Sequence, residues 1–197
     1  MINLNDEEFN SSDIGPIFNG GTAGIAENVK ISVEKRKPED KDKAPDYKLI
    51  FTDENGGNAN LSLWYVDGGT SFATEEELVK KQGKILKHLA HAILGKDHTF
   101  PNFENAKQML DGVMKSLREG LKSGLKFRVF ANYGSTRSVK KYIQIRTWVP
   151  FLEPMSVELE QTRLTKGNID AMEPVKGDSF DASTVDTGAE AADDDDW

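Results

Sequence analysis

The sequence predicts a mostly β domain with an α-helical insert, followed by an acidic tail that we expect to be disordered. Before residue 67, and again after residue 124, apolar and polar residues alternate with a period of two, which is the pattern of half-buried strands. Between these stretches, apolar residues recur at helical spacing. Residues 181–197 are acidic and poor in apolar residues, so they cannot bury enough surface to offset the entropy lost on ordering.

Composition narrows the class of protein. A chain of 197 residues with 37% hydrophobic content is long enough for one well-packed domain with extensions. No apolar run has the length of a membrane helix, and the acidic beginning MINLNDEEF differs from a signal peptide. The absence of cysteine excludes disulfides and thiolate metal sites. We therefore expect a cytoplasmic protein with no membrane segment.

Three strands are predicted before the helices. Residues 1–23 have the composition of an irregular N-terminal arm, and the first strand follows over 25–34. A charged loop with two prolines comes next and is typical of a solvated connection. Residues 47–52 and 59–66 form the second and third strands. They are joined by DENGGN, a strong turn signal because Asn and Gly tolerate positive φ.

Two helices fill the insert. Thr74 begins the first, because Thr-Glu-Glu-Glu is a capping box in which the Thr74 hydroxyl and the Glu77 carboxylate satisfy free amide groups reciprocally. Gly95 is the expected C-cap of this helix. The second helix starts near Asn102 and stops at one of the glycines between residues 120 and 124.

Residues 125–149 predict an antiparallel β-hairpin. Because successive side chains leave opposite faces of a strand, the first arm has an aliphatic face that fits a core, formed by Leu125, Phe127, Val129 and Ala131. The opposite face combines cations with large aromatic rings on both arms. The hairpin is therefore the most unusual surface that the sequence predicts.

The order of three strands, two helices and two strands is that of a five-stranded OB-fold-like barrel, with the two helices between strands 3 and 4. A split α+β sheet would use the same elements, and this alternative stays open. The predicted barrel domain covers residues 24–154, an extended linker covers 155–180, and the disordered acidic tail covers 181–197.

Aromatic rings interleaved with cations are what single-stranded nucleic acid requires, because bases stack on the rings at about 1–3 kcal/mol each while cations hold the phosphates. The predicted stacking residues are Phe130, Tyr142 and Trp148, with Trp64 of the third strand as a further candidate that fits a core position equally well. The predicted phosphate contacts are Lys126, Arg128, Arg137, Lys140, Lys141 and Arg146. The alternative is an aromatic-rich pair of strands buried on both sides, with cationic head groups reaching the edge.

Charge is strongly polarised along the chain. The formal net charge is −8, yet residues 115–148 hold nine basic residues against the single acidic residue Glu119. Residues 155–197 hold 12 acidic and 3 basic residues. A basic patch therefore centres on the hairpin, and a negative segment follows it.

The sequence contains no catalytic motif of weight. His88 and His91 lie three residues apart on the first helix, but no acidic partner completes a zinc pattern, so we expect ordinary surface histidines. The Gly-Gly pairs are not followed by the Gly-Lys-Ser/Thr of a phosphate-binding loop. We predict a protein that is not an enzyme, with no catalytic residue, no metal site and no cofactor.

A basic, aromatic-faced OB-like domain followed by an acidic tail that ends in DDDDW resembles the phage-type single-stranded DNA-binding proteins. The resemblance rests on architecture and on the tail motif rather than on identity along the barrel. It implies that the tail tip, Asp193, Asp194, Asp195, Asp196 and Trp197, docks replication proteins such as a polymerase or a helicase–primase and competes with DNA for the basic surface. A phage origin would place the protein in the host cytoplasm.

The leading interpretation is a sequence-tolerant single-stranded DNA-binding protein that coats and protects DNA in replication, recombination or repair. RNA binding is a variant, because a stacking platform does not by itself distinguish the two nucleic acids. The alternative from another class is a non-enzymatic assembly protein that uses the hairpin face as a protein interface. The oligomeric state stays open, with a homo-oligomer among the options.

Overall fold

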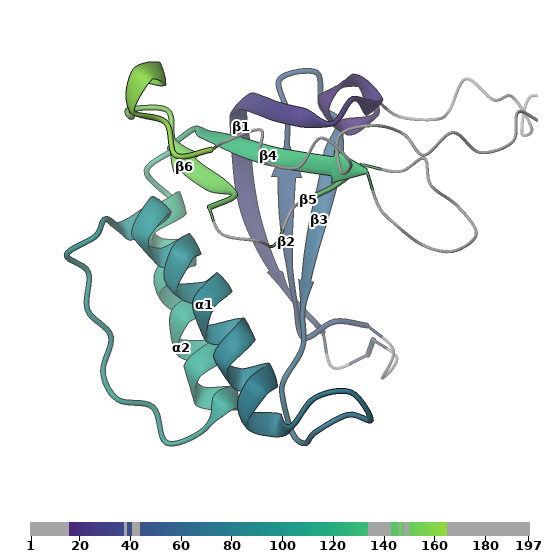
Figure 1. Ribbon diagram of the computed structural model, residues 1–197, viewed down its shortest axis with the longest axis vertical. Helices are drawn as coiled ribbons and strands as arrows, with labels where there is room; N and C mark the ends of the chain where they lie inside the picture. The colour runs from purple at the N-terminus through teal and green to yellow at the C-terminus, as the bar shows by residue number, and fades with distance from the viewer. Residues whose placement is uncertain are drawn as a thin grey trace, which may run out of the picture.

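The computed structural model describes residues 16–37, 39–40, 44–133, 143–145, 147 and 150–164. In chain order the elements are β1 (Gly24–Lys35), β2 (Tyr47–Thr52), β3 (Asn58–Leu63), α1 (Glu75–Leu94), α2 (Ala106–Leu121), β4 (Phe127–Tyr133), β5 (Ile143–Ile145) and β6 (Leu152–Pro154). Short 3-10 turns occur at Phe18–Gly21 and Leu159–Gln161. Figure 1 shows α1 and α2 side by side, next to the sheet.

The strands form one antiparallel sheet of six strands, in the order β3-β2-β1-β4-β5, with β6 also paired to β4. β1 serves both halves of this sheet. Its second half, Lys30–Lys35, pairs with β2, and its first half pairs with β4. The register shifts between Ala26 and Val29, where Asn28 has a φ of 56°. Such a bulge bends a strand and increases its twist, so β1 turns from one half of the sheet into the other.

β5 and β6 share one edge of β4. The last residues of β4 pair with β5, where Ala131 faces Ile145, and the first residues pair with β6, where Phe127 faces Pro154. On its outer side β5 comes close to β3, but no hydrogen-bonded ladder joins the described residues of these two strands. The sheet is therefore open along this edge, and the fold is a mostly β structure with two helices.

The predicted hairpin of residues 125–149 is confirmed in part. Its first arm becomes β4, but the described part of the second arm is a strand of only three residues, and β6 was not predicted. Pro150 has no amide hydrogen, and the amides of Phe151 and Leu152 donate to His88 Nε2, each at 3.1 Å. These constraints allow a second short strand along β4 in place of one continuous arm.

The core lies between the inner face of the sheet and the two helices. Fully buried residues come from every layer, among them Leu49, Phe51, Leu86, Leu89, Leu110, Met114, Leu117, Phe127 and Phe151. The helices approach closely at Gly120, where an added Cβ would lie 2.4 Å from Leu94 Cδ2. This contact explains why a glycine occurs inside α2, although its flexibility makes it a poor helix former.

The local helix signals are confirmed with one shift. Thr74 Oγ1 accepts the amide of Glu77 and the Glu77 carboxylate accepts the amide of Thr74, which is the predicted capping box. Gly95 follows α1 as its C-cap. α2 begins at Ala106 with Asn105 as its N-cap, a few residues later than the predicted start near Asn102.

The packed unit extends past residues 24 and 154 at both ends. Phe18 is 1% exposed and Leu164 is 2% exposed. The chain before β1 docks on the turn between β2 and β3, because Asp53 accepts the amides of Asn19 at 2.7 Å and Gly57 at 2.8 Å. An added Cβ on Gly57 would lie 2.6 Å from the carbonyl carbon and oxygen of Ile17. Only glycine fits against this backbone.

We predict that Gly57→Ala lowers the free energy of unfolding by about 1–3 kcal/mol, because the new methyl group meets rigid backbone of Ile17 rather than a side chain that can move. Urea denaturation measures the change. Asn55→Ala, at an exposed position of the same turn, is the control and should change stability by less than about 0.5 kcal/mol. Equal stability of the two variants would mean that the chain around Ile17 does not dock on the turn.

Candidate nucleic-acid interface

The structure overturns the predicted exposed face of β4. Phe130 is 1% exposed and Arg128 is 6% exposed, so neither side chain lies on a surface where it could stack on a base or hold a phosphate. The first five residues of β4 are all buried. The alternative of a strand buried on both sides describes the first five residues of β4, but the Arg128 head group is buried as well and does not reach the edge.

Arg128 is buried because neighbouring carboxylates and the chain after β6 enclose it. Its Nε lies 3.1 Å from Glu27 Oε1, and its Nη1 lies 3.6 Å from Glu153 Oε1. The same Nη1 donates to the carbonyl oxygen of Val157 at 2.5 Å. Glu153 also accepts from the Thr162 hydroxyl. The guanidinium therefore joins β1, β4, β6 and the following chain, and its role is structural.

The other predicted residues are either exposed or lie outside the described residues. Lys126 is exposed, and its Nζ lies 3.7 Å from Glu54 Oε1, so a phosphate would have to compete with an exposed carboxylate for it. Trp64 is 45% exposed, which decides for the surface over the core. The remaining predicted residues lie outside the described residues, namely Arg137, Lys140, Lys141, Tyr142, Arg146 and Trp148 of the hairpin and Asp193, Asp194, Asp195, Asp196 and Trp197 of the tail.

An exposed polar face lies on the outer side of β1, β2 and β3. Outward positions of the three strands come into register in rows, with Ser32 beside Ile50 and Asn60, and Lys48 beside Ser62. Asn58, Asn60 and Ser62 are exposed, whereas the inward residues of the same strand are buried. The face therefore offers hydrogen-bonding groups on a rigid sheet, where Lys48 lies beside the exposed Glu34 of β1, and it ends at Trp64.

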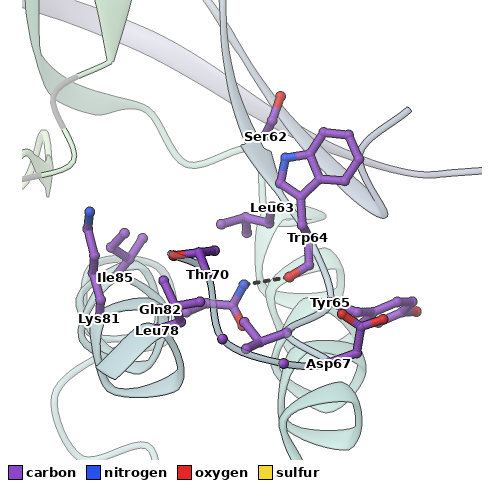
Figure 2. Close-up of a pocket in the computed structure, with 13 residues that line it drawn as sticks. Ser62, Leu63, Trp64, Tyr65, Asp67, Thr70, Leu78, Lys81, Gln82 and Ile85 are labelled. Atoms are coloured by element: carbon purple, nitrogen blue, oxygen red, sulfur yellow. Dashed lines mark hydrogen bonds between the residues drawn. The ribbon is translucent and has the colours of Figure 1, made fainter. Parts of the chain in front are cut away.

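Trp64 is held by its backbone while its ring stays free to contact a ligand. Its carbonyl oxygen accepts a hydrogen bond from Gln82 Nε2 of α1 at 2.8 Å. Figure 2 shows the indole pointing away from α1, beside Ser62. A pocket of about 510 Å³ lies next to it, lined by residues such as Tyr65, Leu78 and Lys81. The hydrogen bond to α1 therefore fixes the backbone of Trp64 at the edge of the exposed face.

Phe72 is a second exposed aromatic residue that the sequence analysis missed. Its ring is 96% exposed on the loop between β3 and α1. The nearby Thr70 hydroxyl accepts the amides of Phe72 and Ala73, which orders this loop locally. A lone Phe in a Gly-rich loop carries no strand or helix pattern, so only its exposure in the structure identifies it.

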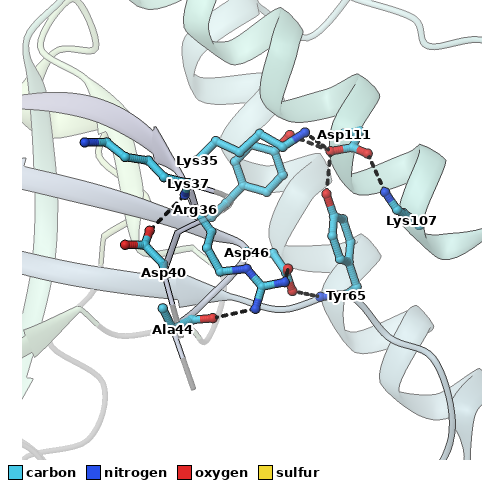
Figure 3. Close-up of polar contacts among 10 residues, drawn as sticks. Lys35, Arg36, Lys37, Asp40, Ala44, Asp46, Tyr65, Lys107 and Asp111 are labelled. Atoms are coloured by element: carbon cyan, nitrogen blue, oxygen red, sulfur yellow. Dashed lines mark hydrogen bonds and ion pairs between the residues drawn. The ribbon is translucent and has the colours of Figure 1, made fainter. Parts of the chain in front are cut away.

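The end of β1 and β2 next to Trp64 is occupied by an ionic network around Asp111 of α2, because Lys35, Tyr47 and Leu63 lie in one row of the sheet. Its Oδ1 accepts from Tyr47 at 2.5 Å, Tyr65 at 2.8 Å and Lys35 at 3.1 Å (Figure 3). Burial alone would raise the pKa of Asp111, but these hydrogen bonds outweigh it and lower the pKa to about 2. Burial and the same carboxylate raise the pKa of Tyr65 to about 12. The network fastens α2 to the sheet.

Each cation of this network already has a carboxylate partner. Lys35 and Lys107 share Asp111, and Arg36 Nη2 lies 2.9 Å from Asp46 Oδ1 (Figure 3). Asp46 also accepts the amide of Tyr65 at 2.7 Å. A phosphate at this end would have to displace carboxylates that are held in place by other hydrogen bonds. This cluster is therefore a weaker anion site than its number of cations indicates.

His88 does not behave as the expected surface histidine. Its Nε2 accepts the amides of Phe151 and Leu152, and its ring centroid lies 4.7 Å from that of Phe151. Burial, together with the positive charge of His91 and Arg163, lowers the pKa of His88 to about 4. The ring is therefore neutral at pH 7 and fastens the start of β6 to α1. No local motif reveals this role, because the partners lie more than sixty residues away.

Comparison of the chain with protein-family models, with curated proteins and with solved structures finds no match. In the part of the chain that the structure describes, no helix combines the length and apolarity needed to cross a membrane. Among the same residues, no group of three or more His, Cys, Asp or Glu side chains is placed to hold a metal ion.

We predict that Arg128→Ala lowers the free energy of unfolding by about 3–5 kcal/mol, because it leaves the buried Glu153 carboxylate without its cation. Urea denaturation measures this loss. Lys126→Ala, two residues earlier and exposed, should change stability by less than about 0.5 kcal/mol. If Arg128→Ala left stability unchanged but weakened nucleic-acid binding, Arg128 would contact a phosphate and would not have a structural role.

We predict that stability falls between pH 6.5 and 4 through His88. The unfolded chain binds this proton at its ordinary pKa and the folded chain only near pH 4, so the contribution is complete above pH 6.5 and is lost as the pH falls. From pH 7.5 to 5 the loss should be about 1–2 kcal/mol, allowing for the partial exposure of the ring. Urea titrations at both pH values measure it.

His88→Gln is the matched variant for this prediction, because an amide oxygen can accept the same backbone amides but does not titrate. Its stability should change much less across the window, whereas His91→Gln should keep the wild-type dependence. A pH dependence that survives in His88→Gln would assign the titration to another group.

Proposed function

We propose that the protein is a sequence-tolerant single-stranded DNA-binding protein built on an OB-type barrel, and that it coats and protects DNA in replication, recombination or repair. The observation that carries the proposal is the strand arrangement. The sheet order β3-β2-β1-β4-β5, a first strand shared by both halves and the approach of β5 to β3 together match a partly open five-stranded Greek-key barrel. The insertion of α1 and α2 between β3 and β4 fits the same plan.

In such a barrel, oligonucleotides bind on the face of strands 2 and 3 and between the loops that follow strands 1 and 4. In this chain that face is the exposed outer side of β2 and β3, with Lys48, the Asn58–Ser62 polar row and Trp64. The loop after β4 carries Arg137, Lys140 and Lys141 in its sequence. On this plan, the basic segment and the exposed aromatic residue belong to the two regions with which an OB-type barrel binds oligonucleotides.

The chemistry of this face supports binding without a base preference. An indole stacks on any base, because every base has a π-face, and lysines neutralise phosphates that carry no base identity. We assign stacking to Trp64, with Tyr142 and Trp148 as partners, and phosphate contacts to Lys126 and the loop cations. Phe130 and Arg128 leave the proposal because the structure buries them.

The acidic tail has a place in the same proposal. Residues 181–197 carry seven acidic groups and no basic one, and they end in Trp197. Tethered to the domain, they reach a high effective concentration at the cationic surface and compete there with DNA. The last five residues supply charge and one aromatic ring for docking replication proteins. The competition should fade with added salt, which screens exposed charges.

The proposal is tested by titrating the full chain with oligo(dT) while following tryptophan fluorescence. We expect quenching and a binding constant that falls steeply with salt, because phosphate contacts release counterions. Trp64→Ala should weaken binding at a fixed salt concentration by about 1–3 kcal/mol, whereas Trp64→Phe keeps a ring and should lose less. Urea denaturation verifies that both variants are as stable as the wild type.

The outcomes separate the function from the site. Binding that is unaffected by Trp64→Ala would remove Trp64 from the platform and leave the function to the hairpin residues. An absence of binding to DNA and RNA oligonucleotides at low salt would overturn the function and favour the assembly protein. Equal affinity for oligo(dT) and oligo(U) would extend the ligand to RNA.

A further inference from the structure

A basic groove runs between α1 and the chain around β6, away from the hairpin that the sequence analysis emphasised. Its volume is about 620 Å³. Four cationic side chains line it, namely Lys84, Lys87, Lys96 and Arg163. All four are exposed, and none forms an ion pair with a carboxylate in the described part of the chain.

The single carboxylate in the lining does not neutralise these cations. Glu153 is 7% exposed and is already engaged by Arg128 and by the Thr162 hydroxyl. Its second oxygen accepts the amide of Arg163 at 3.2 Å. The groove therefore keeps the charge of its four cations, in contrast to the Asp111 network, where each cation has a carboxylate partner.

The groove lining also contains apolar side chains, and two of the four cations, Lys84 and Lys87, are neighbours on α1. Ala92, Leu152, Pro154 and Val157 contribute the apolar surface. Lys84, Lys87 and His91 follow one stripe of α1, with a rise of about 4.5 Å from the first to the second and about 10 Å from the first to the third. Neighbouring cations beside apolar side chains fit a linear polyanion with flat apolar groups better than a compact anion.

The stripe continues toward Trp64. Lys81 lies one turn before Lys84 on the same stripe of α1 and lines the pocket next to Trp64. Figure 2 shows Lys81 on the helix that borders this pocket, with Trp64 on the opposite side. A nucleic-acid strand that stacks on Trp64 can therefore pass over Lys81 and enter the groove. Asp67 is the only carboxylate in the lining of the pocket that it crosses.

We propose that the groove between α1 and β6 is a second contact surface for single-stranded nucleic acid, which binds the backbone that leaves the outer face of β3 at Trp64. The inference rests on the proposed function and extends its site along α1. Lys84, Lys87, Lys96 and Arg163 hold phosphates, and the apolar side chains of the lining contact sugars and bases. The bound length per molecule then exceeds what the sheet face covers alone.

The first test removes charge from the groove. Lys84→Ala with Lys87→Ala preserves helix propensity and should flatten the salt slope of oligo(dT) binding by about 1.4, at about 0.7 per phosphate contact. The ratio of mutant to wild-type Kd should shrink about sevenfold between 50 and 200 mM salt. Lys115→Ala with Lys122→Ala removes the same charge from α2 outside the groove and should leave the slope unchanged.

The second test places a probe in the groove. Because the chain has no cysteine, Gln161→Cys gives a unique position for an environment-sensitive fluorophore on the groove wall, and Lys115→Cys gives a control position on α2. Oligo(dT) should change the emission at position 161 and leave position 115 unchanged. The emission at position 161 should change only with longer oligonucleotides, whereas shorter ones should already quench the tryptophans.

Each result decides the inference. Tight oligo(dT) binding with an unchanged slope in the groove variant and a silent label would overturn the second surface and leave the proposed function intact. No oligo(dT) binding by any measure would overturn both. A label that responds to removal of residues 181–197 but not to DNA would assign the groove to the chain's own acidic segment, and would also overturn the inference.

Discussion

The bend in β1 is the constraint on which the rest of the fold depends. A bulge between Ala26 and Val29 lets one strand of 12 residues pair with β2 through one half and with β4 through the other. A straight strand would hold β2 and β4 in one flat sheet, with β3 and β5 at opposite edges. The bend brings β5 toward β3 instead, so the sheet curls around the core.

Because the sheet curls, the segment that covers the outer side of β4 determines which of its side chains stay exposed. β4 is paired on both edges, and the chain after β6 folds back over its outer side, where Arg128 meets Glu153 and the carbonyl of Val157. The side chains that looked most like a nucleic-acid surface in the sequence are therefore buried in the described structure. None of the described segments covers the outer side of β2 and β3 in this way, and Trp64 and the polar residues of β3 are exposed there.

The sequence predicted correctly the features that depend only on neighbouring residues. The alternation in β1 and β2 and the Thr74–Glu77 capping box needed only neighbouring residues, and each lies where the sequence placed it. β6, the burial of Arg128 and the acceptor role of His88 depend on partners far apart in the chain, and no local pattern contains them. Alternation says which side chains share a face of a strand, but it cannot say whether a later segment covers that face.

The same distinction governs the electrostatics of the candidate site. A count along the chain places the positive charge on the hairpin, yet a cation attracts a phosphate only if no carboxylate already holds it. Arg128, Lys35 and Arg36 are held, whereas the groove cations have no carboxylate partner among the described residues. Displacing a buried carboxylate would leave its charge without compensation, which costs more than an exposed phosphate contact returns. The path of a polyanion should therefore follow the uncompensated lysines of α1, so that the helical insert takes part in binding and does more than support the sheet.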